Sequence, residues 1–178
     1  VFQKQREQFY RMRLFTRLVL PVVLLLSGAG PAPAQGTKYE AENGTLTGSV
    51  SVQTTVAGFS GTGYAGIFEN DGDKAAVTFN LSAAGNYDLY IGYAGPYGDK
   101  KNILTINSNS IEASFPASPA FTETACGRVR LKEGSNTISI TKSWGWFLLD
   151  YFRIEPDTKP DVSVLLPYKL STQAPHRE

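Results

Sequence analysis

Alternation of apolar and polar residues with a period of two, running from about residue 37 to residue 155, constrains the fold of this chain more than any other feature. It is clearest over residues 77–81, 87–93, 128–131 and 137–140. Because successive side chains of a strand point to opposite faces, each segment predicts a half-buried β-strand. Clusters of Asn, Asp, Gly and Ser separate the segments, as tight turns require. We therefore predict an all-β domain, a jelly-roll β-sandwich of about ten antiparallel strands.

The first 34 residues have the pattern of a targeting segment. Residues 12–17 are basic, residues 18–26 are apolar, and the small residues that follow end in Ala32-Pro33-Ala34. We interpret residues 1–34 as upstream residues plus a signal peptide that starts at Met12 and is cleaved after Ala34. The apolar run is too short to span a bilayer. This predicts a secreted, extracellular protein with no membrane attachment after cleavage.

The end of the sequence differs from the middle. Residues 156–178 contain Pro156, Pro160, Pro167 and Pro175 and show no sustained alternation. A segment this short cannot bury a core of its own. We interpret residues 37–155 as the folded module and residues 156–178 as a linker toward a further domain.

Composition and charge exclude several classes of function. The net charge of +1 rests on a strongly basic leader, and the remainder is mildly acidic, so we expect no binding of nucleic acid. Cys126 and His176 are the sole residues of their types, which leaves no intrachain disulfide and too few ligands for structural zinc. Ser-His-Asp and Cys-His catalysis would both depend on His176, in the Pro-flanked tail. We predict no catalytic residues in this chain.

Three acidic residues are candidates for a metal site. Glu40 and Glu42 are two positions apart near the start of the domain, and Asp150 lies in an otherwise apolar run near its end. A buried carboxylate must be paired, hydrogen-bonded or metal-bound. Three hard oxygen ligands completed by backbone carbonyls would suit Ca²⁺ and would join the first strand to the last. The alternative is that the two glutamates are solvated while Asp150 pairs with Arg153 or caps a loop.

Aromatic and polar residues at two predicted loops are candidates for sugar binding. Aromatic rings pack against the C–H faces of sugars, while nearby polar groups hydrogen-bond their hydroxyls. Trp146 has an alternative role as a plug at the end of the core. The predicted ligand-binding residues are Tyr97, Asp99, Lys100, Asn102, Trp144 and Trp146.

Taken together, these residues give the segment from Tyr39 to Glu155 a family likeness: it resembles carbohydrate-binding module family 35, in the group of calcium-containing jelly-roll modules that includes families 6 and 36. Five sequence segments, in order and spread over the whole module, carry the likeness. They are YEAENG (39–44), GFSGTGY (58–64), AGNYDL (84–89), LKEGSNTI (131–138) and WGWFLLDYF (144–152).

The resemblance implies a structural Ca²⁺ held by Glu40, Glu42 and Asp150, with backbone carbonyls near Ser60, Gly61, Thr62 and Gly63. It also implies a ligand site in loops at one end of the sandwich. The Trp144-Gly145-Trp146 segment is similar to the mannan-binding branch of the family, whose members often accompany glycoside hydrolase family 26 mannanases. We therefore expect this chain to be the N-terminal part of such an enzyme.

These observations predict a non-catalytic module, a monomer tethered to a catalytic domain, that targets a secreted glycoside hydrolase to plant-type polysaccharide, β-mannan being favoured. Two alternatives remain at this point. One is a small jelly-roll enzyme that degrades polysaccharides through its carboxylates. The other is an adhesive sandwich domain of the cell surface that binds a different glycan, of the uronic-acid or galactan type.

Overall fold

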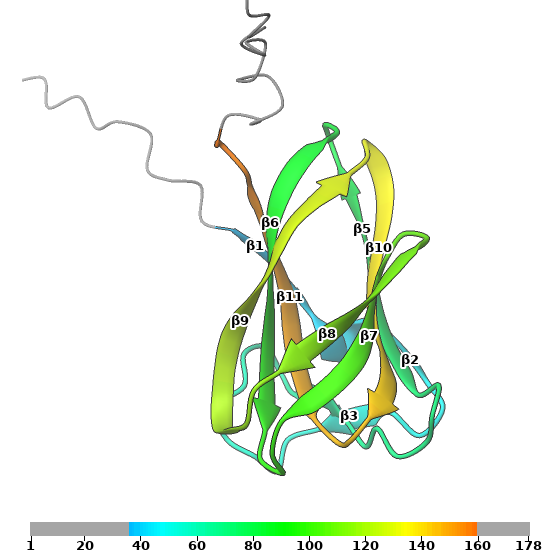
Figure 1. Ribbon diagram of the computed structural model, residues 1–178, viewed down its shortest axis with the longest axis vertical. Helices are drawn as coiled ribbons and strands as arrows, with labels where there is room; N and C mark the ends of the chain where they lie inside the picture. Colours follow the sequence, from blue (N-terminus) through cyan, green and yellow to red (C-terminus); the bar gives the residue numbers. More distant parts are fainter. Residues whose placement is uncertain (1–35, 160–178) are drawn as a thin grey trace, which may run out of the picture. The chain divides into compact units, whose positions relative to one another are not determined.

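A computed structural model describes residues 36–159 of the chain. The predicted signal peptide and most of the predicted linker lie outside the described residues. Within them the chain forms eleven β-strands and one short 3₁₀ turn, in two antiparallel sheets (Figure 1). The predicted all-β sandwich is confirmed. No helix in this part of the chain is long and apolar enough to cross a membrane.

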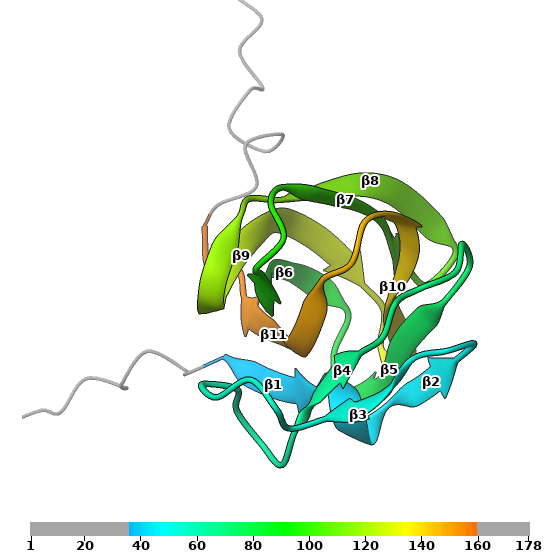
Figure 2. The same cartoon turned by 90° about the horizontal axis from the view of Figure 1, so that it is seen from below.

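Each sheet is assembled from strands that are distant in sequence. The first sheet has the order β3 (Ser51–Gln53), β4 (Tyr64–Gly66), β11 (Leu148–Pro156), β6 (Gly85–Gly95) and β9 (Ser118–Leu131), and β1 (Thr37–Glu40) also pairs with β11. The second has the order β2 (Thr45–Thr47), β5 (Lys74–Leu81), β10 (Gly134–Trp144), β7 (Lys100–Ile106) and β8 (Asn109–Phe115). The 3₁₀ turn η1 (Ala41–Asn43) connects β1 in the first sheet to β2 in the second. The end-on view in Figure 2 shows the two sheets curving around a common interior.

The apolar side chains of the predicted alternating segments form the core of the sandwich. In the second sheet Val77 of β5 lies opposite Ile138 of β10, and both side chains are buried. In the first sheet Ile91 of β6 lies opposite Phe152 of β11, and both are fully buried. Burying each large apolar side chain stabilises the fold by roughly 1.5–3 kcal/mol. The two inward faces therefore supply the main stabilisation of the sandwich.

Phe147, which directly precedes β11, is fully buried and fills one end of the core. Its ring centroid lies 5.1 Å from that of Phe68 and 5.0 Å from that of Phe115. Strand β11 begins at Leu148, so Trp146 belongs to the preceding loop rather than to the strand. The core plug, which was the alternative role of Trp146, is thus supplied by its neighbour Phe147.

Asp73 fixes the loop that leads into β5. Its side chain is buried and accepts hydrogen bonds from the backbone N–H groups of Ser49, Glu69 and Asn70 at 2.9–3.0 Å. These bonds, the one from Asn70 first, favour the ionised form and hold the pKa of Asp73 below its usual value.

We predict that Asp73→Ala lowers the free energy of unfolding by about 3 kcal/mol, because three backbone donors lose their acceptor. Since the pKa is lowered in the folded state, the charge stabilises the fold above pH ~4 and this contribution fades as the pH falls further. Urea unfolding of parent and variant at pH 7 and pH 3 measures both effects. A difference that is the same at the two pH values would contradict the assignment.

Candidate functional site

The loops that follow β6 and β10 lie together at the lower end of the sandwich (Figure 1). Beside them is a cleft of about 290 Å³. One part of its lining comes from these loops and the start of β11, through Tyr97, Trp146 and Leu148. The other part comes from β3, β4 and the segments next to them. The cleft therefore combines the predicted aromatic loops with the edge of the first sheet.

Exposed aromatic rings dominate the loop side of this cleft. Tyr97 is 67% exposed and Trp146 is 49% exposed, and their rings meet edge to face with centroids 6.4 Å apart. Trp144, two residues before Trp146, does not line the cleft but is 63% exposed at the same end of the sandwich. Large aromatic rings that remain in water when a core is available for burial are typical of ligand-binding surfaces.

Lys100 supports the aromatic loops from beneath. Lys100 is buried, and its ammonium group donates a hydrogen bond to the carbonyl oxygen of Tyr97 at 2.7 Å and lies 5.3 Å from the ring centroid of Trp144. Its aliphatic part runs against Gly145, where a Cβ atom would come within 2.4 Å of Lys100 Cδ. Gly145 also has a φ of +83°, which glycine adopts without strain. Lys100 and Gly145 thus fix the turn that presents Trp144 and Trp146.

The two remaining predicted polar residues also contact backbone. Asn102 is fully buried, and its side-chain oxygen accepts the N–H of Ser143 at 3.0 Å, just before Trp144. Asp99 accepts the N–H of Ala117 at 2.8 Å. The structure therefore brings all six predicted binding residues to one end of the sandwich, with the three aromatic residues at the surface and Lys100 and Asn102 beneath it.

Sequence reasoning missed the part of the cleft that belongs to the first sheet. Gln53, Thr55, Ile67 and Glu69 line it, and the Thr55 and Tyr64 hydroxyls hydrogen-bond at 3.0 Å. The GFSGTGY motif, residues 58–64, lies within this segment and ends at Tyr64, which also lines the cleft. Nothing in the local sequence indicated that residues 53–69 would meet the loop after β10, because that pairing depends on the order of strands in the sheet.

The three predicted acidic residues meet the loop at Ser60. The Ser60 N–H donates to both carboxylate oxygens of Asp150, at 3.0 and 3.1 Å, and the Ser60 hydroxyl donates to Glu40 at 2.8 Å. Asp150 is buried, and burial first, with the charge of Glu40 adding to it, raises its pKa to about 6. Two like charges therefore converge on a single serine.

Glu42 reaches the same loop two residues further on. The Thr62 N–H donates to its Oε1 atom at 2.9 Å, while its Oε2 atom is buried and has no hydrogen-bond partner. A Cβ atom at Gly61 would lie 2.3 Å from Glu42 Oε1 and 3.1 Å from Glu40 Cγ. The loop can approach both glutamates this closely only with glycine at this position.

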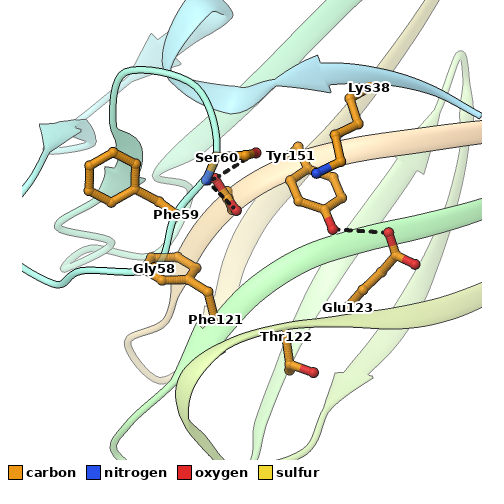
Figure 3. Close-up of a pocket in the computed structure, with 9 residues that line it drawn as sticks. Lys38, Gly58, Phe59, Ser60, Phe121, Thr122, Glu123 and Tyr151 are labelled. Atoms are coloured by element: carbon orange, nitrogen blue, oxygen red, sulfur yellow. Dashed lines mark hydrogen bonds between the residues drawn. The ribbon is translucent and has the colours of Figure 1, made fainter.

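The alternative pairing of Asp150 with Arg153 is not formed. Arg153 instead pairs with Glu123 and Glu155 on the outer face of the first sheet. Figure 3 shows the neighbouring pocket, in which the Tyr151 hydroxyl donates to Glu123 at 3.0 Å and the Lys38 ammonium lies 3.8 Å from the Tyr151 ring centroid. Asp150 does cap the loop at Ser60, which was the other alternative.

The chemistry of this cluster suits a hard cation. Its three carboxylates, including the unpartnered Glu42 Oε2, and the Ser60 hydroxyl are the oxygen ligands that Ca²⁺ prefers. Within residues 36–159, however, no group of three acidic, histidine or cysteine side chains is placed so that it could hold a metal ion as the side chains stand. The N–H groups of Ser60 and Thr62 take up part of the carboxylates' capacity.

A two-sheet β-sandwich with exposed aromatic rings around a cleft at one end defines a binding module rather than a scaffold alone. The family model for carbohydrate-binding module family 35 matches residues 37–157, and the chain belongs to this family. The expected family is therefore confirmed, and with it a role in binding carbohydrate.

Proteins similar to this chain include mannan-degrading enzymes and a separate module of the same family. The chain is 41% identical over 133 residues to mannan endo-1,4-beta-mannosidase B of Piromyces sp., covering 73% of this chain and 23% of that protein. It is similar to the GH26-CBM35 beta-(1,4)-mannanase of Podospora anserina, with a TM-score of 0.68 and 37% identity, covering 71% of this chain and 29% of that one. The family 35 module of Clostridium thermocellum shares the fold, with a TM-score of 0.62 and 22% identity over 70% of this chain and the whole of that module. The chain spans only 21–33% of the length of the mannosidases it matches.

Proposed function

We propose that this chain is the β-mannan-binding module of a secreted mannan-degrading enzyme. The observation that carries the proposal is the group of exposed rings, Tyr97, Trp144 and Trp146, at the end of the sandwich beside a cleft. Rings held in this way provide surfaces for the C–H faces of sugar rings at little entropic cost. Similarity to mannan endo-1,4-beta-mannosidases makes mannan the favoured glycan.

The role of such a module is to keep its enzyme on an insoluble substrate. Attachment through the module makes each encounter of the catalytic domain with the polysaccharide intramolecular and raises its effective concentration there. Tethering to a glycoside hydrolase of family 26 would agree with the Podospora anserina mannanase, which carries a module of this family.

Calcium at the Glu40, Glu42 and Asp150 cluster is the second part of the proposal. The buried Glu42 oxygen without a partner and the proximity of Glu40 to Asp150 support it. Ca²⁺ would neutralise the three carboxylates, with Glu40, Glu42 and Asp150 as ligands and carbonyls of residues 60–63 completing the set. Its contribution would be to stability, by joining β1 and η1 to β11 through the loop.

Two measurements separate this proposal from its alternatives. We expect the protein to be retained in native gels that contain galactomannan or glucomannan and to release no reducing ends from either polymer. Release of reducing ends that is lost in Glu40→Gln or Asp150→Asn would favour a small enzyme. On a glycan array, signal on uronic-acid or galactan glycans with none on mannans would favour an adhesive domain and would overturn mannan as the ligand.

A further inference from the structure

Ile67 has a backbone conformation that does not suit an isoleucine. Its φ is +62°, in the left-handed region, which β-branched residues adopt only at a cost. Glycine or asparagine takes up this conformation much more easily. The side chain is also 38% exposed, so burial in the core does not account for the residue.

The residues on either side hold Ile67 in this conformation. Gly66 before it is paired with Ser51 in the first sheet, and a Cβ atom there would lie 2.8 Å from Gln53 Cγ. Phe68 after it is fully buried against Phe147 in the plug of the core. The chain therefore has to turn at residue 67, and Ile67 lines the cleft that Trp146 and Tyr97 also line. Strain kept at a position that a smaller residue would relieve is typical of functional sites.

The charge of the cleft adds a second constraint. Glu69 lines it, and its side chain has no ion-pair partner among residues 36–159. None of the residues that line the cleft is Lys or Arg. An unneutralised carboxylate at such a site repels an anionic ligand and leaves an uncharged one unaffected.

We propose that Ile67 and Glu69 determine the selectivity of the cleft: Ile67 contacts the apolar face of a sugar ring together with Trp146, and Glu69 restricts the cleft to uncharged sugars. The proposal rests on the proposed glycan-binding function and specifies its ligand as a neutral β-linked glycan. It also assigns a binding role to residues 67–69, none of which is among the ligand-binding residues predicted from the sequence.

The test combines calorimetric titration of mannohexaose with thermal melts. Ile67→Gly and Ile67→Asn remove the contact and relieve the strain, so each should bind about tenfold more weakly and melt about 2–5 °C above the parent. Ile67→Val loses one methylene group and keeps the strain, so it should bind about fourfold more weakly with an unchanged melting temperature. Ile111→Asn, at an exposed isoleucine of β8 that does not line the cleft, is the matched control and should bind like the parent.

Glu69 is tested with a charged ligand of similar length. The parent should bind mannohexaose at least tenfold more tightly than hexagalacturonate, and Glu69→Gln should reduce this ratio with little change toward mannohexaose.

Parent-like affinity in both Ile67→Gly and Ile67→Asn, or a melting temperature of Ile67→Gly below that of the parent, would overturn the role of Ile67. Unaltered discrimination in Glu69→Gln would overturn the role of Glu69. A parent that binds no neutral oligosaccharide would overturn the proposed function and this inference with it, whereas a binding parent with parent-like variants would overturn the inference alone.

Discussion

Saturating Ca²⁺ is expected to raise the melting temperature of this protein by roughly 10 °C over that in excess EDTA. A ligand at a thousand times its dissociation constant stabilises the folded state by about 4 kcal/mol, and each kcal/mol shifts the melting temperature of a domain this size by about 3 °C. The effect is large because the ion would neutralise three carboxylates, of which Glu42 and Asp150 are buried. Differential scanning calorimetry in the two buffers measures it.

Variants distinguish the cluster from other acidic residues. Asp150→Ala and Glu42→Gln should lose most of the response to Ca²⁺. In EDTA, Glu42→Gln should melt no lower than the parent, because it removes a buried charge that has one oxygen without a partner. Asp73→Asn is the matched control: its carboxylate is also buried but accepts backbone N–H groups of two other loops, at Ser49 and at Glu69 and Asn70, so the response to Ca²⁺ should remain. Identical melts of the parent in Ca²⁺ and EDTA would rule out the calcium site.

Trp144→Ala and Trp146→Ala are each expected to weaken binding to galactomannan by about thirtyfold. Loss of a well-placed aromatic anchor commonly costs about 2 kcal/mol of binding free energy. Since Trp144 is 63% exposed, its removal should leave the melting temperature nearly unchanged. Affinity electrophoresis over a range of polymer concentrations gives the dissociation constants.

Phe147→Ala provides the contrast at the adjacent position. This ring is fully buried in the core, so its loss should cost about 3–5 kcal/mol of stability.

Undiminished binding by the double variant Trp144→Ala, Tyr97→Ala would show that the glycan binds elsewhere on the module.

The strands were predictable because one physical rule governs them. Alternation at Val77 and Phe79, or at Ile138 and Ile140, reports directly which face of a strand is buried, and the structure places these side chains in the core. The acidic cluster was also predictable in part, since an aspartate within an apolar strand must find a partner. Which partner it finds depends on the loop at Ser60, and the resemblance to the family located that loop.

The other features depend on tertiary structure. Trp146 and Phe147 are both aromatic neighbours of a strand, and only the geometry of the Gly145 turn decides that Phe147 fills the core while Trp146 remains half-exposed. Lys100 and Asn102 were predicted to read sugar hydroxyls; in the structure Lys100 Nζ and Asn102 Oδ1 bond to the backbone of Tyr97 and Ser143, while Asn102 Nδ2 is buried without a partner. The strained conformation of Ile67 has no signature in the sequence, because it arises from the pairing of Gly66 and the burial of Phe68 on either side.

The most direct test of the central claim is a titration of ¹⁵N-labelled protein with mannohexaose, followed by heteronuclear NMR. We expect saturable shifts of the Trp144 and Trp146 indole N–H signals and of the backbone signals of Tyr97 and Ile67. Signals of the β8 edge, such as Ile111, should not move, and no hydrolysis products should appear in the same sample. The contrary result would be that these aromatic residues show no shifts at millimolar mannohexaose but do shift when an acidic oligosaccharide is added. That result would contradict the assignment of this module to neutral mannan.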